Sequence, residues 1–333
     1  KSIIKIKMTE QEIRKVFSSF NNKKVLLIGD AMIDEYIWGK VKRMSPEAPV
    51  PVVDIDKHEI RLGGSANCAL NIKSLGASPI LCTVIGNDIN GSKFQKLMKD
   101  SDLLTDGVFV DDNRKTTVKT RVISEGKHQL RMDDEDIHPI KIEDQFINTV
   151  DSLLKDTSVI ILQDYNKGVL TKKIIKTLIN KGKEKGIPVV VDPKKDNFLE
   201  YQECDIFKPN LKEIKEGINI EFNESKDEEL QKATSLLKEK LNAKSILLTL
   251  SGKGICINSE DGFVHTPAYG GSVIDVSGAG DTVISVASLL LSTGVIPENI
   301  SKISCLSGGI VCQKVGVVPI DKEELLSETI KIF

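Results

Sequence analysis

Residues 158–194, SVIILQDYNKGVLTKKIIKTLINKGKEKGIPVVVDPK, contain three secondary-structure signals in succession. The segment begins with a short run of β-branched and apolar residues. Apolar residues then recur at helical spacing between Thr171 and Gly186, and a second β-branched run, IPVVVD, follows. A strand, a crossover helix and another strand in this order predict two neighbouring parallel strands.

The same alternation recurs along the chain. KKVLLIGD at 23–30 is followed by the helical pattern SANCALNIKSLG at 65–76, and DIFKPN and KSILLTL are further short strand candidates. We therefore predict an α/β fold with a doubly wound, mostly parallel sheet flanked by helices. There is no internal repeat and no low-complexity linker, so a single main domain is the economical interpretation.

Two segments, 36–58 and 108–133, interrupt the alternation with period-2 patterning, prolines and no helical run. We predict that they form a small antiparallel β lid. The main domain then comprises residues 1–35, 59–107 and 134–333.

Composition excludes several classes of protein. Lys plus Arg number 46 against 48 Asp plus Glu, so no overall charge favours nucleic acid or an anionic membrane. The six cysteines form no C-x-x-C pair, and no apolar run approaches the ~20 residues of a membrane span. We expect a cytoplasmic protein with reduced cysteines. The four histidines share no metal-ligand spacing, so a protein-held transition metal is not expected.

The stretch DVSGAGDT, residues 275–282, combines a flexible backbone with two carboxylates. Gly278, Ala279 and Gly280 allow an anion to approach the main chain, and the helix that follows directs free N–H groups at it. Asp281 could accept a proton from a hydroxyl beside that anion, as phosphoryl transfer to an alcohol requires. By itself such a stretch is more often a capped turn, so other sites must support this interpretation.

Two further stretches suit a sugar. LGGSAN, 62–67, places Gly63 and Gly64 before a helix, with Asn67 able to bind hydroxyls, although an ordinary turn and cap would look the same. Asp30 and Asp34 follow a buried strand, where open α/β sheets bind ligands, although one of them could cap a turn. No Walker A motif is present, and no strand leads into G-x-G-x-x-G, which disfavours a P-loop enzyme and a nicotinamide dehydrogenase.

Taken in order, GDAMIDEYIWG, RMSPEAPVPV, LGGSANCALNIKSLGA, QDYNKG, DPK, KPNLKE and DVSGAGDT resemble the PfkB (ribokinase-like) carbohydrate kinases. The resemblance runs from about Lys24 to about Pro319. SPEAPVPV, DY-x-KG and DPK point more narrowly to the branch that phosphorylates D-glycero-β-D-manno-heptose 7-phosphate at C1, on the ADP-heptose route to lipopolysaccharide core.

The resemblance implies a role for each matching position, with ATP, Mg²⁺ and K⁺ as cofactors. Asp281 matches the catalytic base and 278–280 the anion hole. Asp275 matches a monovalent-cation position. The sugar-contacting positions are Asp34, Gly63, Gly64 and Asn67. The positions that help to place nucleotide and Mg²⁺ are Asn210, Glu213, Thr249, Ser251, Gly252 and Gly254.

A substrate that already carries a phosphate needs cations. Lys167 and Lys194 follow strand ends and are our choice, with Asp192 as a hydroxyl acceptor or ion-pair partner. Other candidates are Arg43, Lys119, Arg121 and Arg131.

The interpretation as a whole is a kinase of heptose 7-phosphate. Its partners are the sugar phosphate and ATP. The resemblance also implies a homodimer through the lid and, because no H-x-G-H motif is present, a separate adenylyltransferase. The alternatives are a kinase of another sugar or sugar phosphate, such as fructose phosphate or ribose, and a non-catalytic sugar-binding regulator. The regulator would be expected to lose Asp281 or a glycine of the anion hole.

Overall fold

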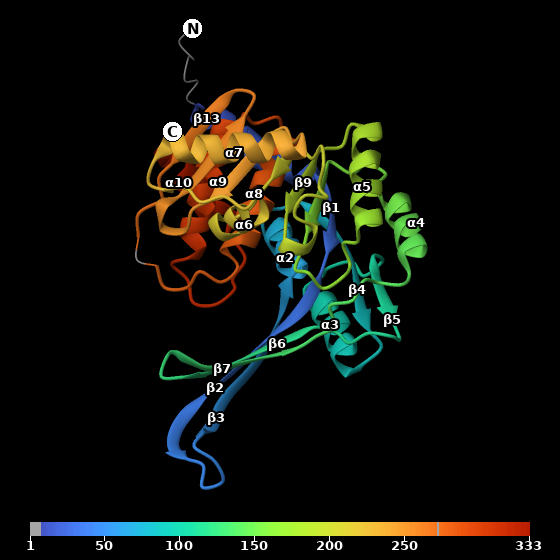
Figure 1. Ribbon diagram of the computed structural model, residues 1–333, viewed down its shortest axis with the longest axis vertical. Helices are drawn as coiled ribbons and strands as arrows, with labels where there is room; N and C mark the ends of the chain where they lie inside the picture. The colour runs from blue at the N-terminus through green and yellow to red at the C-terminus, as the bar shows by residue number, and fades with distance from the viewer. Residues whose placement is uncertain (1–7, 272) are drawn as a thin grey trace.

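The computed structural model describes residues 8–271 and 273–333 and contains a nine-stranded sheet in the order β13-β12-β11-β10-β9-β8-β1-β4-β5 (Figure 1). Its strands, in chain order, are β1 (Lys24–Gly29), β4 (Ser78–Gly86), β5 (Val108–Asp111), β8 (Val159–Gln163), β9 (Val189–Asp192), β10 (Ile206–Phe207), β11 (Ser245–Thr249), β12 (Ile255–Ser259) and β13 (Gly262–Thr266). All neighbours from β5 to β11 pair in parallel, and the β11–β12 and β12–β13 pairs are antiparallel, so β12 alone runs against the other strands of this sheet.

The segment 158–194 forms the predicted unit, because β8 pairs in parallel with β9 and the helix between them crosses over the sheet. That helix, α5 (Lys172–Lys185), begins where the Thr171 side chain accepts a hydrogen bond from the Ile174 amide. It ends at Gly186 in the left-handed conformation, with a φ of 65°.

Helices cover both faces of the sheet, and each face has its own buried apolar cluster. One layer contains α1 (Glu10–Ser19), α2 (Ser65–Ser74), α3 (Ile89–Asp100), α8 (Ala279–Ser292), α9 (Pro297–Val311) and α10 (Lys322–Ile332). The other contains α4 (Glu143–Leu153), α5, α6 (Leu211–Gly217) and α7 (Asp227–Leu241). The predicted doubly wound α/β fold is therefore confirmed. No helix in the described ranges is long and apolar enough to cross a bilayer.

Strand order reverses at β1, which lies between β4 on one side and β8 on the other. Connections from the two sides leave in opposite directions there, and open α/β sheets bind ligands at the carboxyl ends of strands beside such a point.

A second sheet projects from this region, toward the lower end of Figure 1, in the order β3-β2-β6-β7. Its strands are β2 (Ala31–Met44), β3 (Pro51–Gly64), β6 (Val118–Ser124) and β7 (Lys127–Asp134). Three details correct the prediction. The sheet is mixed, because β2 pairs in parallel with β6. It includes 31–35 and 59–64, which we had placed in the main domain. Val108–Asp111 instead joins the main sheet beside β4. Alternation marks a half-buried strand but not the sheet it belongs to.

Candidate active site

Asp281 is the centre of the site. It lies in the first turn of α8, after the helix cap Gly278, and only 7% of its surface is exposed. Its Oδ1 accepts hydrogen bonds from Tyr165 Oη at 2.5 Å and Gln163 Nε2 at 3.2 Å, and its Oδ2 accepts one from Asn67 Nδ2 at 2.7 Å. Donors from the end of β8 and from α2 therefore fix the orientation of the carboxylate.

Burial raises the pKa of Asp281 to about 6. The hydrogen bonds from Tyr165 and Asn67 lower this pKa, while the neighbouring charge of Asp192 raises it further. A carboxylate with such a pKa is ionised at neutral pH and is a stronger base than an exposed aspartate, which suits proton removal from a hydroxyl.

The glycine loop before α8 leaves room at the helix N-terminus. Gly278 has a φ of 77°, and a Cβ there would lie 3.0 Å from Asn67 Nδ2 and from Val317, so a side chain at this position would be strained and crowded. At Gly280 the nearest atom to such a Cβ would be Lys208 Nζ, at 3.7 Å. An anion can therefore approach the backbone at Gly280, where a helix N-terminus and a lysine both favour negative charge.

A cavity of about 510 Å³ extends from this point. It brings together eleven predicted residues: Asp192, Lys194, Asn210, Thr249, Ser251, Gly252, Gly254, Gly278, Ala279, Gly280 and Asp281. Six other predicted residues, Asp34, Gly63, Gly64, Lys167, Glu213 and Asp275, do not line it, and Asn67 reaches it only through Asp281.

The predicted Mg²⁺ positions are tied to local structure. Asn210 and Glu213 form a capping box at the start of α6, and Glu213 also forms an ion pair with Lys194. Lys194 Nζ lies 5.7 Å from the centroid of the Tyr165 ring. Within the described residues no group of three or more His, Cys, Asp or Glu side chains could hold a metal. The role of Asn210 and Glu213 in placing Mg²⁺ stays a prediction.

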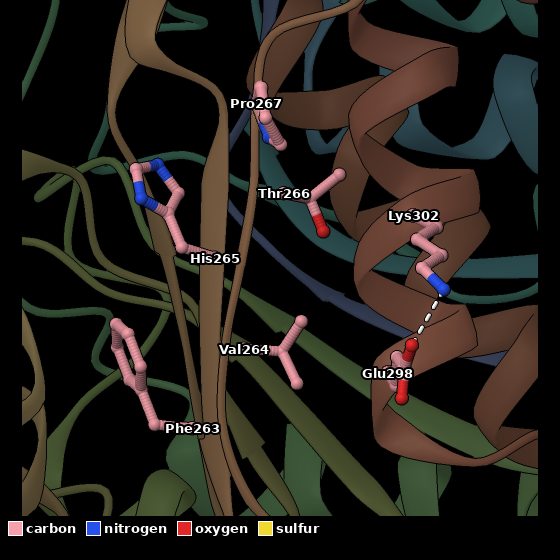
Figure 2. A pocket seen from close by; sticks show the side chains of 7 residues that line it. All are labelled: Phe263, Val264, His265, Thr266, Pro267, Glu298 and Lys302. Carbon is pink, nitrogen blue, oxygen red and sulfur yellow. Dashed lines mark hydrogen bonds and ion pairs between the residues drawn. The ribbon is translucent and has the colours of Figure 1, made fainter. Parts of the chain in front are cut away.

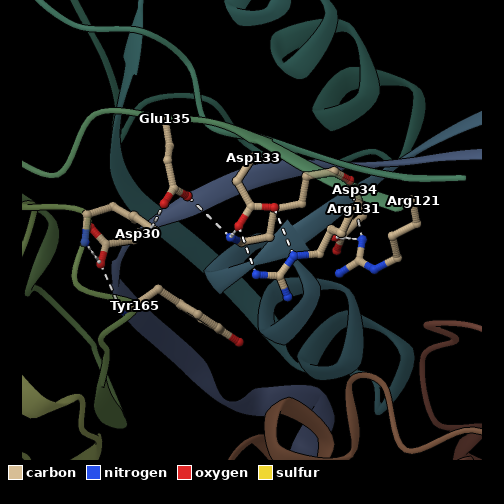
Figure 3. A network of polar contacts seen from close by, with 9 residues as sticks. Asp30, Asp34, Arg121, Arg131, Asp133, Glu135 and Tyr165 are labelled. Carbon is tan, nitrogen blue, oxygen red and sulfur yellow. Dashed lines mark hydrogen bonds and ion pairs between the residues drawn. The ribbon is translucent and has the colours of Figure 1, made fainter. Parts of the chain in front are cut away.

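The predicted sugar contacts link the small sheet to the base. A Cβ on Gly63 would lie 2.2 Å from Asp34 Oδ2, so glycine is needed where the two strands meet. Asp34 Oδ1 accepts a hydrogen bond from Arg121 Nη1 at 2.5 Å (Figure 3). Gly64 caps α2, whose first turn carries Asn67 to Asp281. These contacts form a continuous path from Arg121 to the base.

Asp30 organises a loop instead of facing the cavity. Its carboxylate accepts hydrogen bonds from the backbone amides of Tyr165 at 2.8 Å, Lys167 at 3.1 Å and Val169 at 3.0 Å. The side chain of Lys167 is paired with Glu135 at 2.6 Å. The loop 165–169 is thereby held so that the Tyr165 hydroxyl reaches Asp281.

Asp275 fixes the loop that leads into α8. Its carboxylate oxygens accept hydrogen bonds from the backbone amides of Ser277 at 2.9 Å and Gly316 at 3.0 Å. Although burial opposes the effect, these amides keep the pKa of Asp275 below its ordinary value. The carboxylate is thus ionised beside the glycine loop, and its role near a monovalent cation stays a prediction.

Our sequence prediction missed three site residues. Lys208 is 3% exposed, and its Nζ lies 2.9 Å from Asp192 Oδ2. Gln163 Nε2 donates to the same Asp192 oxygen at 3.0 Å, and Tyr165 contacts the base. All three lie at the carboxyl ends of β8 and β10, within the quoted motifs QDYNKG and KPNLKE. Their position at the carboxyl ends of strands is the sequence signal that could have identified them as site residues.

A second cavity, of about 420 Å³, lies between β13 and α9 (Figure 2). It is lined by Phe263, Val264, His265, Thr266, Pro267, Glu298 and Lys302, and Lys302 is paired with Glu298 at 2.6 Å. It shares no residue with the cavity at Asp281.

A buried carboxylate and an open helix N-terminus, together in one cavity, fit the general base and the anion hole that phosphoryl transfer to a hydroxyl requires. The protein is thus a phosphotransferase with an alcohol as acceptor. The comparisons with known proteins supply the family: the chain belongs to the pfkB family of carbohydrate kinases, whose family model matches residues 22–323.

Individual relatives agree. The chain is 36% identical over 326 residues to a "Bifunctional protein HldE" of Citrifermentans bemidjiense, covering 96% of this chain and 66% of that protein. A protein of the same name from Campylobacter jejuni is 38% identical over 311 residues, which cover 93% of this chain and 66% of that protein. The chain therefore spans slightly less than two thirds of these relatives. Because they are named bifunctional, the comparisons do not support our expectation of a separate partner enzyme.

Solved structures give the same fold. Ribokinase from Arabidopsis thaliana, complexed with ribose and ATP, superimposes with a TM-score of 0.72 at 17% identity over 92% of this chain and 98% of that one. Phosphofructokinase-2 from Escherichia coli, in complex with potassium, superimposes with a TM-score of 0.75 at 18% identity, over 92% of this chain and 99% of that one. The predicted ribokinase-like fold is confirmed by this similarity.

Proposed function

We propose that the protein transfers the γ-phosphoryl group of ATP to the anomeric C1 hydroxyl of D-glycero-β-D-manno-heptose 7-phosphate. The product is the 1,7-bisphosphate, on the ADP-heptose route to lipopolysaccharide core. The observation that carries the chemical step is the fixed Asp281 carboxylate beside the open backbone at Gly280. The choice of sugar is supported by SPEAPVPV, DYNKG and DPK, and by the bifunctional relatives, because some members of the heptose branch carry a second, fused domain.

In this proposal Asp281 accepts the proton of the C1 hydroxyl as that oxygen attacks phosphorus. The amides at 278–280 face the transferred group, while Lys194 and Lys208 place positive charge along the same cavity. Mg²⁺ bound with ATP would neutralise phosphate charge, and Asn210 and Glu213 would help to hold it. The small sheet would act as a lid that excludes water, so that ATP is not hydrolysed wastefully.

Two further parts of the proposal concern cofactor and assembly. We infer a K⁺ site near Asp275. The support for it is the resemblance of Asp275 to the monovalent-cation position, together with the potassium named for the Escherichia coli structure of the same fold. We also infer a homodimer through the outer face of the small sheet, which exposes Leu130 and Met132.

The test is an ATP-consumption screen of purified protein against heptose 7-phosphate, fructose 1-phosphate, fructose 6-phosphate, ribose and adenosine, with Mg²⁺ and K⁺. Turnover with heptose 7-phosphate above all others is the expected result. Turnover with a different sugar would overturn the heptose assignment and leave the sugar kinase in place. Sugar binding without turnover on any acceptor would favour the non-catalytic regulator.

A further inference from the structure

Two arginines lie directly opposite one another on the small sheet. Arg121 of β6 pairs with Arg131 of β7 in the antiparallel register, so both side chains share one face. Figure 3 shows the two guanidinium groups beside each other, with Asp34 next to Arg121. Like charges at directly opposed positions destabilise a sheet. An anion held between the guanidinium groups would remove that repulsion.

The neighbouring carboxylates do not fully neutralise this face. Four cations, Lys119, Arg121, Arg131 and Lys167, share three carboxylates, Asp34, Asp133 and Glu135. Asp133 is divided between Lys119 and Arg131, each at 3.0 Å, and Glu135 between Lys119 at 3.2 Å and Lys167 at 2.6 Å. This group of seven side chains therefore carries one positive charge that no carboxylate within it neutralises.

Donors for a ligand are also present. Both hydrogen bonds that Arg121 makes within the described ranges use Nη1, which leaves Nη2 and Nε. Tyr36, 5% exposed, lies between Arg121 and Arg61, each 5.3 Å from its ring centroid. Its hydroxyl is buried and has no hydrogen-bond partner among the residues that the structure describes. A buried polar atom of this kind is normally paired, so a ligand oxygen is its missing partner.

This group is joined to the base. Arg121 contacts Asp34, Asp34 lies against Gly63, and the chain continues through Gly64 into α2, where Asn67 contacts Asp281. A molecule that spans this path would place one end at Asp281 and the other at the arginines. The two lysines that we had chosen from the sequence are less suited to bind the substrate phosphate. Lys194 is paired with Glu213 beside the cavity at Asp281, and Lys167 is paired with Glu135.

We propose that Arg121, Arg131 and Tyr36 bind the phosphate group of a phosphorylated sugar, at the end remote from the hydroxyl that reacts. The site would take a phosphomonoester dianion, which two guanidinium groups can bind by paired hydrogen bonds. This inference rests on the proposed function for the identity of the sugar, but the anion site itself does not depend on which sugar is used.

The experiment measures phosphate binding and kinetics in matched variants. Inorganic phosphate is titrated calorimetrically into the full chain saturated with Mg²⁺ and a non-hydrolysable ATP analogue, so that the nucleotide site is already occupied. The variants are Arg121→Gln, Arg131→Gln and Arg121→Lys, which keeps a charge beside Asp34. Lys42→Gln, at an exposed lysine of the same sheet that pairs with Asp54, is the control, and Lys167→Gln tests the alternative.

Phosphate binding should be retained in wild type and in K42Q and be lost in R121Q and R131Q. The KM for the phosphorylated sugar should rise about 10- to 100-fold in both, while the KM for ATP changes by less than about 3-fold. R121K should be intermediate, because a lysine keeps the charge without the planar fork. Unchanged KM for the phosphorylated sugar and unchanged phosphate binding in folded R121Q and R131Q would overturn the inference, as would loss of phosphate binding in K167Q alone.

The outcome is separable from that of the proposed function. If heptose 7-phosphate is not a substrate but phosphate binding still requires both arginines, the anion site stands and the sugar assignment fails. If heptose 7-phosphate is a substrate and its KM is unchanged in R121Q and R131Q, the proposed function stands and this inference fails.

Discussion

As the proposed base, Asp281 combines two requirements that oppose each other. A base must be desolvated to hold a proton well, yet it must remain ionised at the pH of the reaction. Burial raises its pKa to about 6, and the hydrogen bonds from Tyr165 and Asn67 limit that rise. The balance places the carboxylate in its useful form at neutral pH.

Replacement of Asp281 by Asn should lower kcat by about 10²- to 10⁴-fold, which is the usual contribution of a general base. ATP binding should change little, because the amides at 278–280 remain. Turnover assays with the best acceptor of the screen, and titration with a non-hydrolysable ATP analogue, measure the two effects. A near-normal rate in the variant would remove Asp281 from the chemical step.

The Tyr165 hydroxyl should position and tune the base. In wild type, kcat/KM should fall as the pH decreases through about 6, because Asp281 becomes protonated. Tyr165→Phe removes a hydrogen bond that lowers this pKa, so the acid limb should move to higher pH and the loss of activity should be larger at pH 6 than at pH 8.

The matched control is Tyr201→Phe. Tyr201 is fully buried and donates to Asp164 at 2.6 Å, outside the cavity, so its loss removes an equivalent hydrogen bond away from the base. The pH profile of kcat/KM should separate the two variants. If Tyr165→Phe lowered activity equally at every pH, Tyr165 would not act on the pKa of Asp281.

At the scale of elements, the start of α8 determines what the site can bind. The loop 275–278 is fixed by Asp275 and by the left-handed Gly278, and the helix then presents its first amides beside Asp281. The carboxyl ends of β8, β9 and β10 supply Tyr165, Asp192 and Lys208 to the same cavity. The site is therefore an edge where several elements end, in accordance with the rule for open α/β sheets.

Two glycines in this loop should respond differently to alanine. Gly278→Ala should destabilise the fold by about 1–2 kcal/mol and displace Asn67, because its φ is positive and its Cβ would lie 3.0 Å from Asn67 Nδ2. At Gly280 the φ is not positive and a Cβ would make only an ordinary contact, 3.7 Å from Lys208 Nζ, so the thermal midpoint of Gly280→Ala should stay near that of wild type.

The new methyl group at 280 would nevertheless occupy space where the transferred phosphate approaches the backbone. We expect kcat/KM for ATP to fall by about 10²-fold in this variant, comparable to the loss of one oxyanion donor. Thermal unfolding and steady-state kinetics on both proteins check the contrast. A fully active Gly280→Ala variant would mean that no anion reaches this amide.

At the scale of the whole molecule, the small sheet has two unlike faces. Arg121 and Arg131 share one face. The alternate positions share the other, where Val122 pairs with Leu130 on one side and with Ile37 on the other. Leu130 is 55% exposed, Met132 48% and Ile55 63%. A sheet that exposes this much apolar surface on one face is suited to pairing with a second copy.

We expect a homodimer that Leu130→Asp and Ile55→Asp weaken, because each would place a charge in an apolar interface. Light scattering coupled to size-exclusion chromatography should give a dimer mass for wild type and a shift toward monomer for both variants. Leu104→Asp, at a residue that is 57% exposed outside the small sheet, is the control and should remain dimeric. A monomeric wild type at micromolar concentration would contradict the prediction.

The sequence by itself determined the layers and indicated the proposed reaction centre. Periods of 2 and 3.6 residues distinguish strands from helices, so the parallel sheet and the unit 158–194 could be predicted. DVSGAGDT places base and anion hole within a few residues, where local geometry is sufficient. The resemblance of the motifs supplied the family.

Only the tertiary structure decided which distant side chains meet. Lys208, Gln163 and Tyr165 reach Asp192 and Asp281 from different strand ends, and the opposition of Arg121 and Arg131 depends on strand register. It also decided that Val108–Asp111 belongs to the main sheet and that Asp30 holds a loop. These facts depend on pairing between segments far apart in sequence, and a local pattern carries no information about the partner of a strand or the neighbour of a charge.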